Sequence, residues 1–309
     1  MLRQALLTAS RSDSVRRAVE TAPVSRALVR RFVAGTGTAD AVRVAATLAA
    51  EGLLVSLDHL GEDTVDREQA DTVREAYLAL LAALGEAGLT ARAEVSVKLS
   101  AVGQALGRDG HKIALENARA ICAAADAVGT TVTLDMEDHT TTDSTLAILT
   151  ELRSEFPSVG AVLQAYLRRT EGDCRDLART GSRVRLCKGA YSEPANVAYQ
   201  DTHEVDKAYV RCLAILMAGE GYPMIASHDP RIIEIARALA ARHRREADSY
   251  EFQMLYGVRP DAQQALAGDG LRMRVYVPYG QEWYGYLMRR LAERPANVAF
   301  FLRSLVSRG

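Results

Sequence analysis

The residues with the clearest potential for chemistry lie in one short segment near the end of the chain, YLMRRLAE at 286–293. In a helix, residues at i, i+3, i+4 and i+7 share one face, and here they are Tyr286, Arg289, Arg290 and Glu293. Two adjacent guanidinium groups can hold a carboxylate or a phosphate through paired hydrogen bonds. A basic helix face in solvent has the same spacing, so the segment alone indicates either an anion site or a solvated surface.

Further ionisable side chains stand where short apolar runs end. They are Lys98, Asp135, Arg185, Lys188 and His228, and Gln164, Gln253 and Tyr276 end three other runs. Asp135 could act as a general base, a metal ligand or the ionic partner of Lys98, but a metal site would need more converging carboxylates. Lys98 could form a Schiff base, as in barrel aldolases. A ring of structural ion pairs is the alternative to all of these roles.

Eight apolar runs carry these side chains, and each is typical of a β-strand. The runs are LLVSLD (53–58), EVSVKL (94–99), TVTLDM (131–136), GAVLQAY (160–166), RVRLCKG (183–189), YPMIASH (222–228), YEFQMLYG (250–257) and MRVYVPYG (273–280). A turn and a segment long enough for a helix follow each run, which predicts parallel pairing. Eight such units favour a (βα)8 TIM-type barrel, with its functional side chains at the carboxyl ends of the strands. A Rossmann fold would need a GxGxxG turn after the first strand, and 57–61 has none.

The composition excludes several other classes of protein. The 309 residues contain 38 Lys and Arg against 39 Asp and Glu, a formal net charge of -1, so we expect no nucleic-acid partner. The 4 cysteines form no CxxC pair, which is typical of buried reduced thiols, and the 6 histidines are not clustered as zinc ligands. We therefore expect no metal site.

The beginning of the chain differs from the rest in its pattern. Residues 1–45 are predicted to form a helical arm, and residues 46–309 the catalytic barrel. The first residues, MLRQALLTASRSDSVRR, have only a short apolar stretch, and we interpret them as a helical lead-in and not as a secretion signal. No apolar run approaches the roughly 18 to 20 residues of a membrane span.

Eight segments, in order, resemble the monofunctional bacterial proline dehydrogenases, a family of flavoenzymes. They are VKLSAVG (97–103), LDMED (134–138), LQAYLRR (163–169), RLCKGAY (185–191), ASHD (226–229), EFQMLYG (251–257), VYVPYG (275–280) and YLMRRLAERPAN (286–297). The resemblance implies a distorted (βα)8 barrel that binds FAD at its mouth without a Rossmann motif. It also implies oxidation of L-proline at C5 to Δ1-pyrroline-5-carboxylate by hydride transfer to the flavin, the first step of proline catabolism to glutamate.

The resemblance implies a substrate site and two catalytic side chains. Arg289 and Arg290 match the pair that clamps the proline carboxylate, which Lys98 also reaches, so the role of Lys98 is ionic. Asp135 matches the aspartate linked to that lysine and to the substrate, and Arg185 matches the arginine beside the flavin N5 edge. The aromatic residues that match the packing surface for the proline ring are Tyr276 and Tyr286.

The cofactor site follows from the same resemblance. Met136 and Leu163 match residues lining the isoalloxazine, and Gln164 matches the residue that bonds its pyrimidine ring. The positions matching the phosphate and ribose region are Lys188, Gly189 and Ala190, and the flavin contacts on the sixth strand are Ser227 and His228.

The resemblance also implies partners. These are L-proline, a membrane quinone as electron acceptor, and a separate pyrroline-5-carboxylate (glutamate semialdehyde) dehydrogenase, since one barrel and an arm use all 309 residues. We expect a cytoplasmic protein that meets the inner face of the membrane only peripherally. A Schiff-base aldolase using Lys98, or an inactive barrel serving as an interaction protein, are the alternatives.

Overall fold

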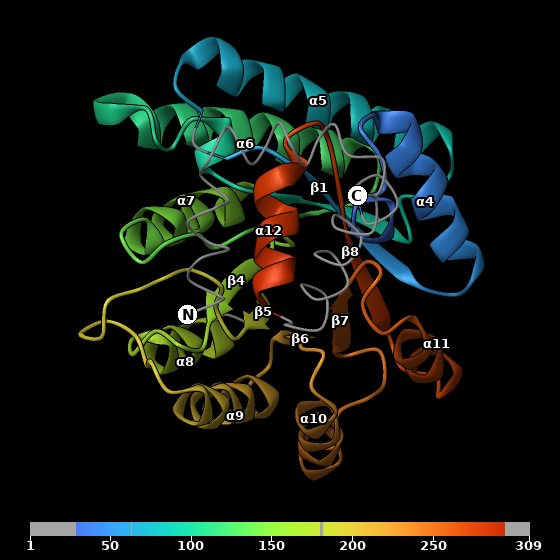
Figure 1. Ribbon diagram of the computed structural model, residues 1–309, viewed down its shortest axis with the longest axis vertical. Coiled ribbons are helices and arrows are strands. Elements are labelled where there is room, and N and C mark those ends of the chain that lie inside the picture. Colours follow the sequence, from blue (N-terminus) through green and yellow to red (C-terminus); the bar gives the residue numbers. More distant parts are fainter. Residues whose placement is uncertain (1–28, 63, 180–181, 294–309) are drawn as a thin grey trace, which may run out of the picture.

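The computed structural model describes residues 29–62, 64–179 and 182–293, which form a parallel eight-stranded barrel surrounded by helices (Figure 1). The strands are β1 (Leu54–His59), β2 (Ala93–Val97), β3 (Val132–Leu134), β4 (Ala161–Gln164), β5 (Arg183–Cys187), β6 (Tyr222–Ala226), β7 (Glu251–Leu255) and β8 (Met273–Tyr279). Each overlaps one of the eight predicted runs, so the prediction of a (βα)8 barrel is confirmed.

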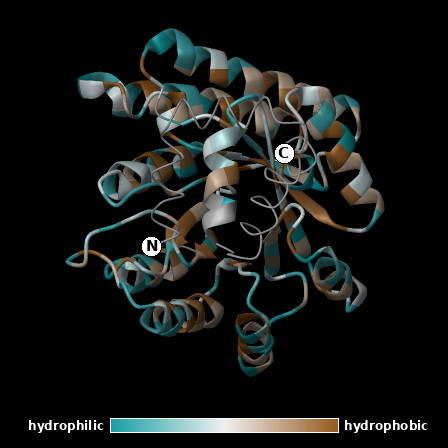
Figure 2. Ribbon diagram, viewed as in Figure 1, coloured by the Kyte–Doolittle hydropathy of each residue, from teal (hydrophilic) through white to brown (hydrophobic). Residues whose placement is uncertain are grey.

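Helices alternate with the strands and carry hydrophobic and hydrophilic residues side by side (Figure 2). They are α4 (Thr38–Ala50), α5 (Arg67–Glu86), α6 (Gly110–Ala127), α7 (Thr142–Glu155), α8 (Thr170–Arg179), α9 (Thr202–Ala218), α10 (Pro230–Arg242), α11 (Pro260–Gly268) and α12 (Trp283–Glu293). Two short 3₁₀ helices, η1 (Ser100–Val102) and η2 (Gly107–Asp109), follow β2. Among the helices in the described part of the chain, none is long and apolar enough to cross a membrane.

Each barrel helix buries one face against the strands. In α5 the buried residues Tyr77, Leu80, Leu81 and Leu84 recur at helical spacing, and α5 begins where Asp66 accepts a hydrogen bond from the backbone of Gln69. The last helix, α12, is placed differently and crosses the open end of the barrel (Figure 1). Most of the arm predicted for residues 1–45 lies outside the described residues, and α4 runs across the expected boundary at residue 45.

The barrel is nearly closed, with its weakest seam between β3 and β4. Hydrogen-bonded pairing follows the order β3-β2-β1-β8-β7-β6-β5-β4, and the two ends meet only through the parallel bridge between Thr133 and Gly160. Gly160 is required here, because a Cβ at this position would lie 2.6 Å from Thr133 Oγ1. The backbone can therefore approach closely enough for Leu134 N to donate to Gly160 O at 2.9 Å.

The interior of the barrel is charged, although most (βα)8 barrels fill this space with branched apolar side chains. Glu94 on β2 accepts hydrogen bonds from Ser56 Oγ at 2.6 Å and from Arg183 Nη2 at 2.5 Å. Arg274 on β8 donates to Glu251 on β7 at 2.6 Å. Although burial acts to raise the pKa of Glu94, the guanidinium groups around it lower that pKa well below its ordinary value. The lower half of the barrel is thus held by buried ion pairs.

Glu94→Ala tests the contribution of this network to stability. The substitution removes a carboxylate partner from the buried Arg274 and from the partly buried Arg183, and we expect the free energy of unfolding to fall by about 3 to 5 kcal/mol in urea denaturation. Glu116→Ala is the matched control, since its ion pair with Arg67 is exposed and contributes at most about 1 kcal/mol. Equal losses in the two variants would show that the interior network is not stabilising.

Candidate active site

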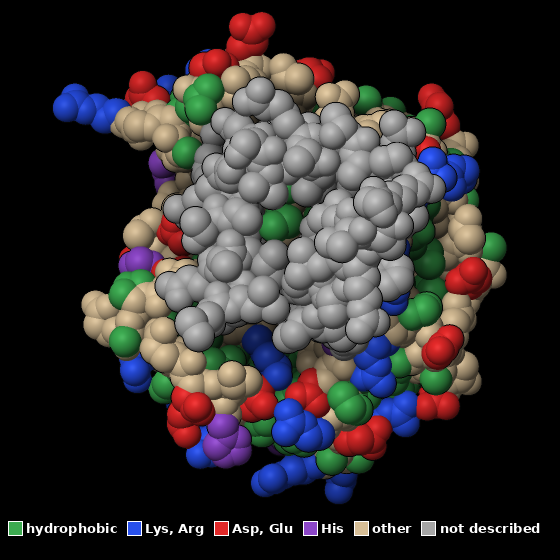
Figure 3. Space-filling model, in the orientation of Figure 1, with side chains coloured by type: hydrophobic (Ala, Val, Ile, Leu, Met, Phe, Trp, Pro, Cys, Tyr) green, Lys and Arg blue, Asp and Glu red, His purple; other side chains and the backbone are tan. Residues whose placement is uncertain are grey.

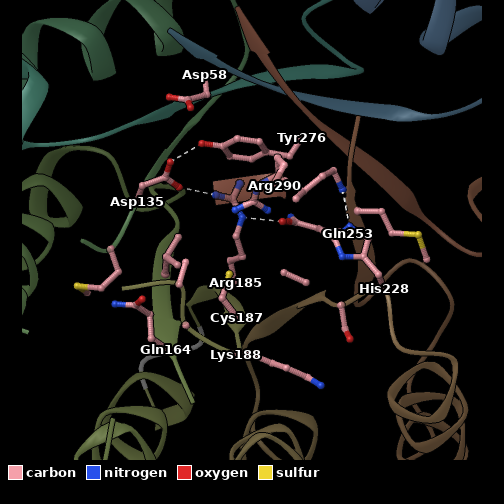
Figure 4. Close-up of a pocket in the computed structure, with 18 of the residues that line it drawn as sticks. Asp58, Asp135, Gln164, Arg185, Cys187, Lys188, His228, Gln253, Tyr276 and Arg290 are labelled. Carbon is pink, nitrogen blue, oxygen red and sulfur yellow. Dashed lines mark hydrogen bonds and ion pairs between the residues drawn. The ribbon is translucent and has the colours of Figure 1, made fainter. Parts of the chain in front are cut away.

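A cavity of about 580 Å³ opens at the carboxyl ends of the strands (Figure 4). This volume lies within the range of small-molecule sites, roughly 300 to 1,000 Å³. The predicted site residues that line it are Lys98, Asp135, Met136, Gln164, Arg185, Lys188, Gly189, Ala190, Ser227, His228, Tyr276, Tyr286 and Arg290. The structure therefore brings together side chains separated by up to almost two hundred positions, because parallel strands present all their carboxyl ends to one mouth.

One predicted site residue, Leu163, does not line this cavity. Leu163 is buried in the hydrophobic layer between strands and helices, whereas its neighbours Val162 and Gln164 face the cavity. The reason is strand alternation, which sends successive side chains to opposite faces. The side chain of Arg289 lies outside the described part of the structure. The thiol prediction also needs a correction, since Cys187 is only half-buried and lines the cavity.

Arg185 is a buried residue of the cavity wall, and Figure 4 shows its contacts with Asp135 and Gln253. Its Nε donates to Gln253 at 2.6 Å, its Nη1 to Asp135 at 2.6 Å and to Ser96 at 2.9 Å, and its Nη2 to Ser56 at 3.2 Å. Burial acts to lower the pKa of Arg185, but the carboxylate of Asp135 raises it overall, so the guanidinium remains charged. A fixed cation thus faces the centre of the cavity.

Lys98 and Asp135 form a second charged group beside Arg185. Lys98 Nζ donates to Asp58 Oδ2 at 2.6 Å and lies 3.6 Å from Asp135 Oδ2, which accepts from Tyr276 OH at 2.6 Å. Burial acts to lower the pKa of Lys98, yet the two carboxylates raise it well above its ordinary value. A Schiff-base lysine must be a neutral amine to attack a carbonyl. The aldolase alternative is therefore disfavoured.

Asp135 is held as an anion. Burial acts to raise its pKa, but Lys98 and Arg185 lower it below the ordinary value, and hydrogen bonds from Tyr276 and Ser96 add to this effect. A carboxylate held in this way is a poor proton acceptor near neutral pH. Its hydrogen bonds and ion pairs orient the cations and the phenol around the cavity.

Two important side chains were not nominated from the sequence. Asp58, the residue before the last of β1, holds Lys98. Gln253 on β7 holds Arg185, and its own amide donates to Glu251 Oε1 at 2.5 Å. Asp58 lies near the end of β1 and Gln253 was already noted on the seventh predicted run, so the reasoning that selected Lys98 could have been extended to both. Their polar partners could not be identified from the sequence, because Asp58 precedes Lys98 by a whole strand–helix unit.

The other side of the cavity presents polar groups of the β5 and β6 loops. Lys188 Nζ is paired with Asp206 at 2.5 Å and Asp229 at 3.5 Å, so the predicted phosphate ligand shares its charge with two carboxylates. His228 Nε2 accepts from Leu255 N at 3.0 Å, which places the imidazole proton on Nδ1. Charged side chains of both signs are interspersed on the described surface around the mouth (Figure 3).

Glu137, the residue after Met136 in the chain, is a buried carboxyl group. Its oxygens accept from Ser100 N at 2.9 Å and Ser100 Oγ at 2.5 Å, and its carbonyl accepts from Gln164 Nε2 at 2.7 Å. Burial raises the pKa of this carboxyl from 4.5 to about 7. Glu137 thus connects the loops after β2 and β3 with the end of β4, and its raised pKa brings its ionisation close to neutral pH.

Glu137→Gln tests this ionisation through the pH dependence of stability. Because the pKa of Glu137 is raised in the folded protein, its contribution to stability is present at low pH and is lost as pH rises through about 7. A neutral amide avoids this loss. We expect the variant to gain on the order of 2 kcal/mol relative to wild type between about pH 5 and about pH 8 in denaturation experiments. Parallel stability profiles for the two proteins would contradict the raised pKa.

The fold and the cavity together define a class of protein. Side chains from all eight strands and from α12 converge on one site, as in enzymes built on (βα)8 barrels. The cations Lys98, Arg185 and Arg290 line this cavity, which suits a small anionic ligand. Within the described residues, no group of three or more His, Cys, Asp or Glu side chains is arranged to hold a metal ion.

Comparison with known proteins places the chain within this class. A family model described as proline dehydrogenase matches residues 41–303, and the chain therefore belongs to the proline dehydrogenase family. It is 38% identical to proline dehydrogenase 1 of Bacillus subtilis (strain 168) over 308 residues, 100% of both chains. It is 41% identical to proline dehydrogenase of Deinococcus radiodurans over 281 residues, 90% of both chains.

A solved structure gives the same architecture. Proline utilization A (PutA) from Bdellovibrio bacteriovorus, crystallised after inactivation by N-propargylglycine, matches with a TM-score of 0.82 and 26% identity over 92% of this chain. The match covers 34% of that longer chain, so this protein corresponds to about a third of it.

Proposed function

We propose that the protein oxidises L-proline to Δ1-pyrroline-5-carboxylate, with FAD as its cofactor and a quinone as the electron acceptor. The observation that carries this proposal is the convergence of Lys98, Arg185 and Arg290 on one cavity in a member of this family. The imine product opens in water to glutamate semialdehyde, a substrate for a separate pyrroline-5-carboxylate dehydrogenase. A quinone acceptor requires contact with the membrane, and we expect a cytoplasmic protein in peripheral contact with its inner face.

The donor set of the cavity fits a flavin. Arg185 supplies a fixed positive charge, which stabilises a reduced and anionic ring system. The amide of Gln164 and the Nδ1–H of His228 are polar groups suited to the edges of a heterocycle. The backbone at Gly189 adopts a φ of +116°, and its missing side chain makes room for the ring of Tyr166, so the peptide groups of this loop can lie along the cavity wall. When bound, FAD would accept a hydride from proline C5 and pass the electrons onward.

The substrate carboxylate would be held by cations from opposite walls. Lys98 comes from the end of β2, where Asp58 fixes its ammonium group, and Arg290 comes from α12 with its guanidinium 5.1 Å from the ring centroid of Tyr286. By family resemblance, Arg289 would complete this clamp. Tyr276 is fixed by its bond to Asp135, and its ring would pack on the proline ring. These contacts favour a small amino acid with a free carboxylate.

Anaerobic reduction of the purified protein tests the proposal. We expect bound flavin with absorbance at about 450 nm that bleaches on addition of L-proline and persists with D-proline, because a clamped carboxylate directs C5 toward the cofactor in only one of the two enantiomers. A colourless protein, in which borohydride traps a carbonyl substrate on Lys98, would instead support the aldolase alternative.

Arg290→Met tests the carboxylate clamp. Losing one charge-assisted hydrogen bond to a desolvated carboxylate should raise the KM for L-proline roughly 10- to 150-fold while the flavin content stays unchanged. Arg119→Met, which removes a surface pair with Glu155, is the control. With L-prolinamide, which has no carboxylate, wild type and Arg290→Met should differ little. An unchanged KM for proline would exclude Arg290 from the clamp.

A further inference from the structure

A buried carboxylate outside the cavity connects three consecutive loops of the barrel mouth. Glu193 lies in the loop between β5 and α9, and its side chain is only 3% exposed. Oε1 accepts from His139 N at 2.9 Å and from Tyr166 OH at 3.3 Å, while Oε2 contacts His139 Nδ1. His139 belongs to the loop after β3 and Tyr166 to the loop after β4. One side chain therefore joins the loops that follow β3, β4 and β5.

Tyr166 holds the β5 loop at both of its ends. Its backbone N donates to Lys188 O at 2.9 Å, and its carbonyl accepts from Tyr199 N at 2.8 Å. Its ring covers Gly189 so closely that any Cβ at that position would overlap the ring. Burial, with the neighbouring Glu193 carboxylate, raises the pKa of Tyr166, so its hydroxyl stays protonated and donates to Glu193. The loop is thus closed at its base by backbone bonds and fixed in its middle by Glu193.

The residues that this cluster supports are those proposed to contact the flavin. The cavity wall includes Met136 from the β3 loop, Gln164 from the end of β4, and Lys188, Gly189 and Ala190 from the β5 loop. Glu193, His139 and Tyr166 do not line the cavity themselves and lie behind its wall. A buried carboxylate is costly unless hydrogen bonds and an ionic partner offset its desolvation. Removing Glu193 should therefore release the three loops from one another.

We propose that Glu193, with His139 and Tyr166, is a positioning residue for the cofactor, holding the β5 loop where its backbone at Gly189 and Ala190 can bind FAD. The inference rests on the proposed function. Under this proposal Glu193 raises the affinity of the protein for FAD, and substituting it leaves the binding of the substrate carboxylate by Lys98 and Arg290 unchanged. A group that only orients the ligands of a cofactor acts on the affinity of the site, as partners behind metal ligands do.

The experiment measures FAD binding to apo-protein by the quenching of flavin fluorescence. For Glu193→Ala we expect a rise in the Kd for FAD of roughly 10- to 100-fold, comparable with losses of such supporting groups elsewhere. Glu193→Gln should give a smaller rise, since its amide oxygen can still accept from the backbone of His139. At saturating FAD, the KM for L-proline should match that of wild type. Glu204→Ala on α9, whose exposed carboxylate pairs with Lys207, is the matched control and should leave the Kd unchanged.

A cycle of variants separates positioning from general loss of structure. His139→Ala should also raise the Kd, and the double variant His139→Ala with Glu193→Ala should raise it by less than the product of the single effects. If Glu193→Ala does not fold, the Kd for FAD of Glu193→Gln and of His139→Ala tests the inference in its place. Wild-type FAD affinity in these variants, or an altered KM for proline with unaltered affinity, would overturn the inference. Wild-type protein that binds no FAD would instead overturn the proposed function.

Discussion

The ion pair between Arg185 and Asp135 is the interaction around which the upper half of the barrel is organised. The bonds of the Arg185 guanidinium reach β1, β2, β7 and the residue after β3 through Ser56, Ser96, Gln253 and Asp135. Neither charge could remain in this interior alone, because an unpaired buried ion costs several kcal/mol. Each partner keeps the other ionised, so the cation proposed to face the flavin is provided by the same contact that joins the strands.

A second layer of charge beneath this pair explains why the first is tolerated. Glu94 and Glu251 are balanced there by Arg183 and Arg274, while Asp58 and Asp135 are balanced above by Lys98 and Arg185. Each layer has two acids and two bases and is therefore neutral as a whole. Glu94 connects the layers, since Ser56 donates to it and accepts from Arg185. The barrel consequently gives up the apolar packing usual for this fold and gains a rigid array of charges.

Much of this architecture could be predicted from the sequence, but the hydrogen-bond and ion-pair partners of the buried side chains could not. The strand periodicity and the parallel connections predicted the barrel, and the barrel in turn predicted that Lys98, Asp135 and Arg185 share one mouth. Leu163 packs in the hydrophobic core, because a shift of one residue along a strand exchanges the cavity face for the core face, and its contact with the flavin stays a prediction. The bond from Arg185 to Gln253 spans 68 positions, and only the closed sheet shows which polar residues meet. The position of α12 across the mouth likewise depends on tertiary packing.

The buried cluster around Glu193 also lies at the seam between β3 and β4, where it adds to the few contacts that close the barrel. Backbone pairing there is limited to the bridge of Thr133 with Gly160, whereas the other neighbouring strands share longer ladders. Beyond the strand ends, side chains connect the two sides of the seam: Gln164 donates to the carbonyl of Glu137, and Glu193 accepts from the backbone of His139. The wall with the fewest sheet hydrogen bonds is thus the one proposed to contact the flavin, and its geometry depends on these few polar contacts. Substitutions in these polar contacts can therefore change the position of the cofactor-binding loops, while the seven other strand pairings of the barrel stay the same.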